Sequence, residues 1–258
     1  MGVVNATPDS FSDGGLAFEP AAAVDRALAL HADGAAWLDI GGESTRPGAR
    51  PVDEREELRR VVPVIAALRA QCSARLSIDT RKAAVARAAL DAGADVVNDV
   101  SAGAFDPMLL ELVAARGCGW IAMHARGTPE TMQHAPRYDD APREVLAELR
   151  ASVARALERG VRRERIWIDP GIGFGKRLED NVALLQRLGE LHELGLPIVV
   201  GISRKGFLGA LSGERDAAKR DLETAAALFA CVRARAHVVR VHDVAGAKRA
   251  MAVAASLL

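Results

Sequence analysis

Eight short apolar runs recur along the chain, and each ends in a polar residue that is followed by a loop and a helix-like stretch. The polar residues at the ends of these runs are Asn5, Asp39, Asp79, Asn98, His124, Asp169, Ser203 and His242. The runs are rich in valine and isoleucine and lack sustained polar alternation, as parallel strands covered on both faces do. This repeated unit predicts an α/β fold, a (β/α)8 TIM barrel, whose active site lies at the C-terminal ends of its strands.

The first predicted strand is unusually short, because only four residues precede Asn5. A short or truncated first strand predicts a weak seam or an exposed edge in the barrel. A doubly wound sheet is the rival fold, but it prefers five or six strands and a GxGxxG turn after the first, which is absent here. The predicted strands are Val3–Asn5, Trp37–Ile40, Leu76–Asp79, Val96–Asn98, Trp120–His124, Ile166–Asp169, Ile198–Ile202 and Val238–His242.

Apolar stripes at helical spacing separate these runs. Within the stripe that follows Asp53, Pro63 is expected to kink the helix or to restart it. Asp140 is expected to cap a helix with Pro142 in its first turn. No linker or change in composition divides the chain, so we expect a single domain over residues 1–258.

Size and charge narrow the class of protein. The chain has 258 residues, the usual size of one such barrel. Lysine plus arginine equals aspartate plus glutamate, 34 each, which argues against a nucleic-acid or membrane partner. The three cysteines lack metal-ligand spacing and favour a reduced compartment. No apolar run reaches the ~18 residues of a membrane span and no secretory pattern is present, so we expect a cytoplasmic protein.

Asp79, Asn98 and Asp169 form the most informative group of polar residues. A barrel aims the side chains at its strand ends toward the central axis, so two carboxylates and an amide would face one buried ligand. These groups suit a flat heterocycle that carries several N–H donors and a carbonyl. The alternative is that the acids cap the following helices or pair with nearby cations.

Two polar loops follow the first two strands. The segment from Asn5 to Gly15 is rich in Asp, Ser and Gly, which suits a mobile lid or an ordinary connector. In the second loop, Arg46 is able to bind a carboxylate or phosphate through its planar fork, and Pro47 stiffens the backbone. A surface turn with a solvated arginine is the alternative.

The ends of the last two strands carry cations. The segment Ser203–Lys205 follows the seventh strand, while Arg240 and His242 end the eighth and lie two residues apart, on the same side of a strand. Loops at these positions often hold phosphate in barrels of this kind, which favours an anion site. The alternative is a salt bridge from Arg240 to Asp243 or Glu223.

Eight motifs in the chain resemble those of one enzyme family. They are NATPDSFSDGG, GGESTRPGA, SIDTRK, VVNDVS, MHARGTPETMQ, IDPGIGFGK, GISRKGFLG and VRVHDV, in this order from Asn5 to Val244. With them the chain resembles the dihydropteroate synthases of folate biosynthesis. The resemblance implies condensation of 6-hydroxymethyl-7,8-dihydropterin pyrophosphate with para-aminobenzoate, an alkyl-group transfer. Alternatives are a pterin-binding homologue without synthase activity, which would not need both polar loops, and a pterin-dependent methyltransferase, which lacks TPDSFSDGG and SRK.

The resemblance also implies roles for individual residues. Those that would hold the pterin are Asp79, Asn98, Met123, Asp169, Phe174, Gly201 and Lys205. Those that would hold the pyrophosphate are Asn5, Thr45, Arg46, Arg240 and His242, with Mg²⁺ at or near Asn5. Those that would shape the para-aminobenzoate site are Phe11, Thr45, Pro47, Ser203 and Lys205.

Three residues are expected to act in catalysis, namely Asp13, Arg46 and Lys205, of which the first two belong to mobile loops. The family is usually dimeric, so the resemblance also implies a homodimer. The chain departs from the family pattern by lacking the usual N-terminal hairpin and part of the first strand. None of its departures removes a residue assigned above.

Overall fold

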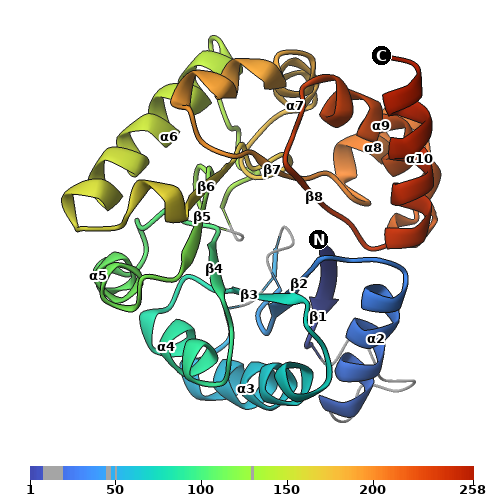
Figure 1. Ribbon diagram of the computed structural model, residues 1–258. Coiled ribbons are helices and arrows are strands. Elements are labelled where there is room, and N and C mark those ends of the chain that lie inside the picture. The colour runs from blue at the N-terminus through green and yellow to red at the C-terminus, as the bar shows by residue number, and fades with distance from the viewer. Residues whose placement is uncertain (8–19, 45–47, 50, 129–130) are drawn as a thin grey trace.

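A ring of helices surrounds a barrel of parallel strands (Figure 1). The structure is a computed structural model that describes residues 1–7, 20–44, 48–49, 51–128 and 131–258. The strands in these residues are β1 (Gly2–Asn5), β2 (Trp37–Gly41), β3 (Arg75–Asp79), β4 (Val96–Asp99), β5 (Gly119–Met123), β6 (Ile166–Asp169), β7 (Val199–Gly201) and β8 (Val238–Arg240). The α-helices are α2 (Pro20–Ala32), α3 (Glu54–Gln71), α4 (Ala83–Asp91), α5 (Pro107–Arg116), α6 (Ala141–Glu158), α7 (Leu178–Gln186), α8 (Gly206–Ser212), α9 (Asp221–Arg233) and α10 (Val244–Ser256).

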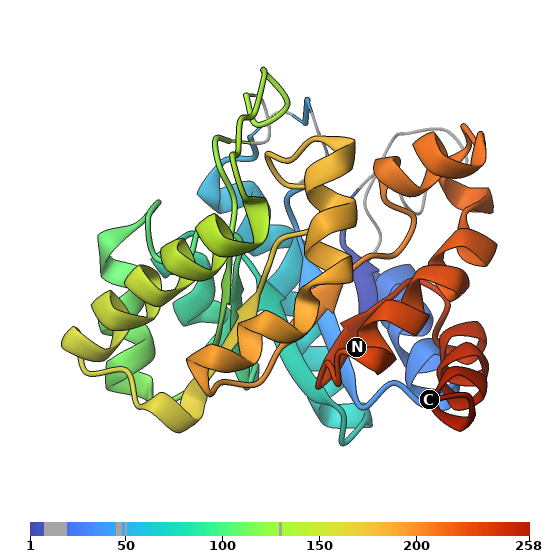
Figure 2. The ribbon, with the colours of Figure 1, turned by 90° about the horizontal axis from the view of Figure 1, so that it is seen from above.

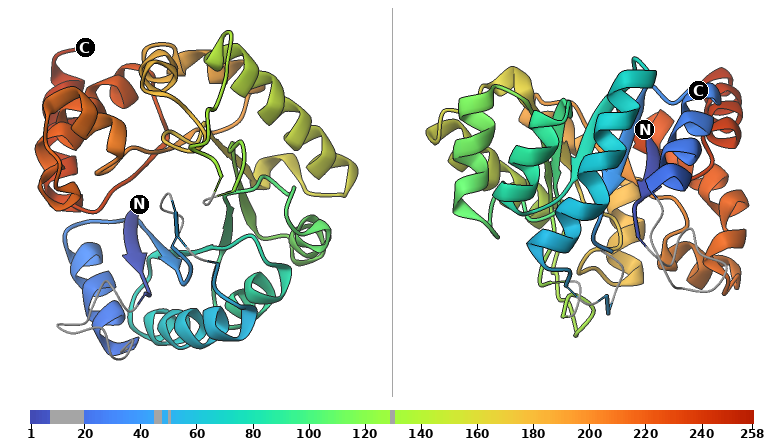
Figure 3. Two further views of the ribbon diagram at one scale, coloured as in Figure 1. Left: turned by 180° about the vertical axis from the view of Figure 1, so that it is seen from behind. Right: turned by 90° about the horizontal axis from the view of Figure 1, so that it is seen from below.

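Strands and helices alternate around the ring, so the (β/α)8 barrel predicted from the sequence is confirmed. All eight predicted strand positions are occupied, with ends that differ by one or two residues. The views from above and from behind show the helices outside the strands (Figure 2; Figure 3). Among the described helices, none combines the length and the apolar character that crossing a membrane requires.

The barrel closes through two narrow joints. Strands β1 to β6 form one sheet in sequence order, and β7 pairs with β8. A bridge between Ile168 and Ile198 joins the two sheets on one side. On the other, the Val3 amide donates to the Val241 carbonyl at 3.0 Å, and the Val241 amide donates to the Met1 carbonyl at 2.9 Å. Strand β1 is therefore hydrogen-bonded on both edges, and the expectation of an exposed edge is wrong.

Two strands alternate between apolar and polar residues, contrary to the expectation from the sequence. Leu38 and Ile40 of β2 are fully buried in the core between strands and helices. Asp39 lies between them, so it projects into the barrel interior. Ser77 of β3 is in register with Asp39 and is also buried. The interior of the barrel is thus polar at this level.

An apolar floor lies below these polar residues, toward the N-terminal ends of the strands. Its members are Met1, Trp37, Val96, Ile121, Trp167, Val199 and Val238. The guanidinium of Arg75 stacks over the Trp37 ring at 4.7 Å from its centroid. TIM barrels are filled in such layers, so the open end is the one at which the strands terminate.

Two expectations about the helices have different outcomes. Helix α3 continues through Pro63 as one helix, so of the two alternatives, a kink or a restart, the restart is wrong. Asp140 does cap α6, because its carboxylate accepts from the Arg143 amide at 3.3 Å, and Pro142 lies in the first turn. The capping acid and the proline together fix where this helix begins.

Candidate active site

One hollow at the C-terminal ends of the strands brings together all the residues predicted to hold the pterin. These seven residues are Asp79, Asn98, Met123, Asp169, Phe174, Gly201 and Lys205. Its walls also include Val100, Gly171, Ile172 and Arg240. The barrel produces this convergence because the seven residues come from the ends of five strands, β3 to β7, or from the loops that follow them, and Arg240 ends β8.

Asp169 is buried and held by the turn that follows β6. Its Oδ1 accepts a hydrogen bond from the Gly171 amide at 2.7 Å. Gly171 has a φ of 64°, and a Cβ at this position would lie 1.8 Å from the His124 carbonyl oxygen, so only glycine fits. Burial raises the pKa of the Asp169 carboxyl, while the Gly171 hydrogen bond lowers it. The tight turn thus fixes the direction of a buried acid.

Arg240 joins two carboxylates inside the barrel. Its Nε donates to Oδ2 of Asp39 at 2.6 Å, and its Nη2 donates to Oδ2 of Asp79 at 2.9 Å. Burial raises the pKa of the Asp79 carboxyl, and the charge of Arg240 opposes that rise. The ion pairs suggested from the sequence, to Asp243 or Glu223, are wrong because Asp243 caps α10 instead. Arg240 lines the same hollow as the predicted pterin residues.

Lys205 lies against the aromatic wall of the hollow. Its ammonium is 4.1 Å from the centroid of the Phe174 ring, a cation–π contact. Burial, together with the nearby charge of Arg240, lowers the pKa of Lys205 to about 8. An ammonium in this place offers donors to a carbonyl or ring nitrogen of a bound ligand.

The ends of β7 and β8 meet through Ser203 and His242. The His242 amide donates to Oγ of Ser203 at 3.1 Å, and its ring Nδ1 lies 2.9 Å from the same oxygen. Two residues assigned to different ligands are therefore in contact. Arg204, between Ser203 and Lys205, instead makes a two-point ion pair with Asp221.

The remaining predicted site residues come from the first two loops. Asn5 is half-buried at the end of β1, in register with Gly41 of β2. The others lie outside the described residues, and their roles stay predictions: Phe11, Asp13, Thr45, Arg46 and Pro47. Across the residues that are described, no cluster of three or more His, Cys, Asp or Glu side chains has the arrangement of a metal site.

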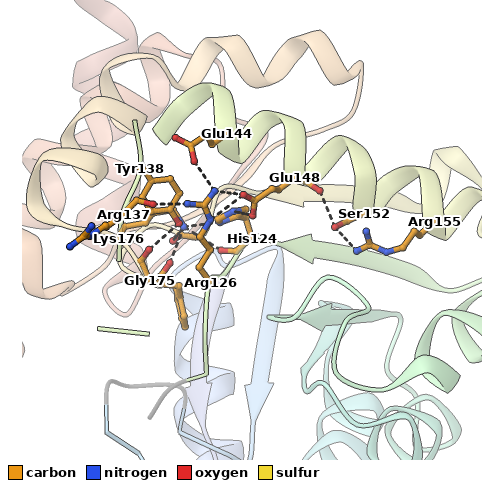
Figure 4. Close-up of polar contacts among 12 residues, drawn as sticks. His124, Arg126, Arg137, Tyr138, Glu144, Glu148, Ser152, Arg155, Gly175 and Lys176 are labelled. Atoms are coloured by element: carbon orange, nitrogen blue, oxygen red, sulfur yellow. Dashed lines mark hydrogen bonds and ion pairs between the residues drawn. The ribbon is translucent and has the colours of Figure 1, made fainter. Parts of the chain in front are cut away.

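A buried lysine that the sequence did not single out supports one wall of the hollow (Figure 4). Lys176 is 3% exposed, and its Nζ donates to the carbonyls of Gly171 at 2.9 Å and Phe174 at 3.0 Å. It also donates to Nδ1 of His124 at 2.9 Å. Because the Glu148 carboxylate only accepts, His124 carries its proton on Nε2, which donates to Oε2 of Glu148 at 2.9 Å.

This network ties together the loops that follow β5 and β6. Burial lowers the pKa of Lys176 to about 7, and burial with the charge of Lys176 lowers that of His124 to about 4. Arg126 extends the network, since it bonds to Glu148 and stacks over the Tyr138 ring at 3.9 Å. The only sequence signal for Lys176 was its place at the end of the glycine-rich motif IDPGIGFGK.

Comparison with known proteins agrees with this geometry. The model of the family described as pterin binding enzyme matches residues 1–242. The dihydropteroate synthase of Mycobacterium leprae is 48% identical over 264 aligned residues, which cover 100% of this chain and 93% of that protein. The chain belongs to the dihydropteroate synthase family. The family predicted from the eight motifs is thus confirmed.

Solved structures of the dihydropteroate synthase family share the fold. The Xanthomonas albilineans enzyme with 4-aminobenzoic acid is 45% identical and superposes with a TM-score of 0.93, covering 99% of this chain and 91% of that one. The same enzyme in complex with 7,8-dihydropteroate is 42% identical with a TM-score of 0.89, covering 99% and 92%. The barrel is therefore shared across nearly the whole chain.

Proposed function

We propose that this chain condenses 6-hydroxymethyl-7,8-dihydropterin pyrophosphate with para-aminobenzoate to give 7,8-dihydropteroate and pyrophosphate. One observation carries the proposal, namely that seven residues assigned to the pterin line a single hollow with Arg240 at its wall. The family supports the same reaction, since its Xanthomonas albilineans member has been solved with 4-aminobenzoic acid and with 7,8-dihydropteroate.

The pterin would lie flat in the hollow. Asp79 and Asp169 supply acceptors for ring N–H groups, and Asn98 supplies both an acceptor and a donor. Lys205 would donate to the ring carbonyl or a ring nitrogen. Phe174 and Met123 form an apolar part of the wall. The polar side chains would hydrogen-bond to the edges of the heterocycle, and the apolar side chains would pack on its faces.

Arg240 and His242 would neutralise the leaving group. The bond between the pterin methylene carbon and the pyrophosphate oxygen breaks, and its electron pair leaves with the pyrophosphate. The cationic methylene that remains is stabilised by electron donation from the ring and by a nearby carboxylate, the role assigned to Asp13. The aryl amine nitrogen then bonds to the methylene and releases one proton. Closure of the first two loops would keep water from capturing the cation.

The end of β1 offers Mg²⁺ one protein ligand, the side-chain amide oxygen of Asn5. This ion usually binds through one or two protein oxygens together with substrate phosphates and keeps several waters. Asn5 is half-buried and supplies one such oxygen. An ion held in this way does not require a cluster of acidic residues, and the described residues contain none with the arrangement of a metal site. When bound there, the ion would offset negative charge on the pyrophosphate.

The para-aminobenzoate site would form between Ser203, Lys205 and the two loops. Ser203 is buried and contacts His242, so the second substrate would sit beside the anion site. Its other assigned residues, Phe11, Thr45 and Pro47, belong to the loop segments outside the described residues.

We also propose that the protein is a cytoplasmic homodimer. Three large apolar residues are well exposed on or beside α9: Leu211 is 60%, Leu222 is 80% and Phe229 is 40% exposed. Leu222 and Phe229 are seven residues apart, which places them on one face of α9. Sedimentation equilibrium tests this part of the proposal, which predicts twice the chain mass and a shift toward monomer in Leu222→Asp.

Steady-state release of pyrophosphate tests the proposed reaction. We expect release only when the pterin pyrophosphate and para-aminobenzoate are both present. Pterin binding without any release would favour a pterin-binding homologue that is not a synthase. Release at the same rate without para-aminobenzoate would indicate simple hydrolysis and would contradict the proposal.

A further inference from the structure

Asp39 lies beneath the hollow and does not line it. Its neighbours Leu38 and Ile40 are turned outward into the core, so its carboxylate points into the barrel interior. The residue is 0% exposed. Its carboxylate accepts hydrogen bonds from Asn98 and Arg240, both of which line the hollow.

The contact with Asn98 fixes which way the amide faces. Asn98 donates from Nδ2 to Oδ2 of Asp39 at 3.1 Å. The same oxygen accepts from Nε of Arg240 at 2.6 Å, an ion pair that keeps Asp39 an acceptor. The flipped amide would set the Asn98 oxygen against the carboxylate oxygen, two acceptors in a buried place where an unmade hydrogen bond is costly.

Asn98 therefore meets a ligand with its carbonyl oxygen and its second N–H in a fixed arrangement. Together with Asp79 and Asp169, this gives the hollow three acceptor side chains. A pteridine that carries an amino group at its 2-position matches such an edge. In a pteridine with an oxo group at this position, the oxo oxygen, which only accepts, would face the acceptor oxygens of these side chains and could not bond to them.

We propose that Asp39 is a positioning residue that acts through Asn98 and makes the site select 2-amino over 2-oxo pteridines. The inference rests on the proposed function, because it takes the pterin as the ligand of this hollow. Asp39 would touch neither substrate. Its effect would be on specificity, through the orientation of one amide.

Calorimetric titration with two ligands tests the proposal. The ligands are 6-hydroxymethylpterin and its analogue with an oxo group in place of the 2-amino group. Neither carries a phosphate, so any effect of Asp39 on the anion site is absent from both dissociation constants. An effect that reaches Asp79 through Arg240 would persist in a variant that lacks Asn98. In Asp39→Ala, residue 39 neither donates nor accepts, so it no longer fixes which way the Asn98 amide faces.

We expect Asp39→Ala to reduce the preference for the amino ligand about tenfold, the factor that one misdirected hydrogen bond of roughly 1.4 kcal/mol represents. Part of this change should be tighter binding of the oxo analogue, a gain that general damage to the fold would not produce. Ser77→Ala is the matched control, since Ser77 is buried at the same level of the barrel and its hydroxyl has no hydrogen-bond partner among the described residues. The control should leave the ratio unchanged.

The Asn98→Ala background shows whether Asp39 acts through that amide. There, adding Asp39→Ala should no longer alter the ratio. A change that persists without Asn98, or an equal loss for both ligands in the single variant, would overturn the inference. If Asp39→Ala does not fold, Asp39→Ser offers a hydroxyl that both donates and accepts through one oxygen, so it does not fix the Asn98 amide either. The ratio of the two dissociation constants is then measured in that variant. If the wild-type protein binds neither ligand, the result contradicts the proposed function and not only the role of Asp39.

Discussion

Arg240 donates from Nη2 to Oδ2 of Asp79 at 2.9 Å, so a cation assigned to the leaving group touches a carboxylate assigned to the pterin. The same guanidinium bonds to Asp39 through Nε. The anion site and the pterin site therefore share one side chain. Its removal should affect both ligands, but unequally.

Arg240→Ala should weaken binding of the pyrophosphate-bearing substrate by roughly 2–4 kcal/mol, because a charge that faces a desolvated anion is lost. Binding of the bare hydroxymethylpterin should weaken less, since Asp79 still accepts from the ring. Titration of both ligands measures the difference, and the exposed Arg249→Ala serves as the control. Equal losses for the two ligands would contradict the assignment of Arg240 to the leaving group.

His124→Gln should remove part of the acid sensitivity of the fold. The folded-state pKa of His124 is about 4, below its ordinary value of 6.5, because the ring is buried beside Lys176. The unfolded chain therefore binds the proton first as pH falls, and the free energy of unfolding drops between pH 6.5 and 4, by up to about 3 kcal/mol. Urea unfolding at several pH values in this window should show a smaller slope for the variant. The same slope in both proteins would mean that His124 is not held neutral by its surroundings.

Lys176→Met should loosen the wall of the hollow that Phe174 provides. The change leaves buried carbonyls of Gly171 and Phe174 without their donor, which should lower the free energy of unfolding by roughly 1–3 kcal/mol. Affinity for the pterin should fall at the same time. Exposed Lys219→Met is the control. Unaltered pterin affinity in a destabilised Lys176→Met protein would limit this lysine to a role in stability.

Asp13→Ala should lower turnover while it leaves pterin affinity nearly unchanged. Asp13 lies outside the described residues, in the loop after β1, and it is separate in sequence from the strand ends that line the hollow. An interaction made only near the transition state reduces the catalytic rate and not ground-state binding. Pterin titration and single-turnover rates on one preparation compare the two effects. If affinity falls as much as the rate does, Asp13 contacts the bound pterin directly.

The sequence predicted the convergence of Asp79, Asn98 and Asp169 because their position at strand ends already determines where they point. It did not predict the partners of Arg240, since Asp39 is 201 residues away and only closure of the barrel brings the two together. The hydrogen bonds on the second edge of β1 were not predicted for the same reason, because their partner Val241 is at the other end of the chain.

Lys176 was missed for a different physical reason. A lysine after a glycine-rich turn usually keeps its charge in water, and burial of an ammonium is costly unless acceptors surround it. Those acceptors are backbone carbonyls and one ring nitrogen, whose positions depend on the path of the turn and not on residue identity.

The rate of 7,8-dihydropteroate formation, followed by mass spectrometry in wild-type protein and in Asp169→Asn, tests the central claim most directly. In the variant, the Gly171 amide would hold the remaining oxygen and turn an NH₂ group toward the ring N–H donors of the pterin. We predict product from the wild type only when both substrates are present, and a rise in KM for the pterin substrate that corresponds to roughly 2–4 kcal/mol in the variant. Absence of product from the wild type, or an unchanged KM in a folded Asp169→Asn protein, would contradict the account.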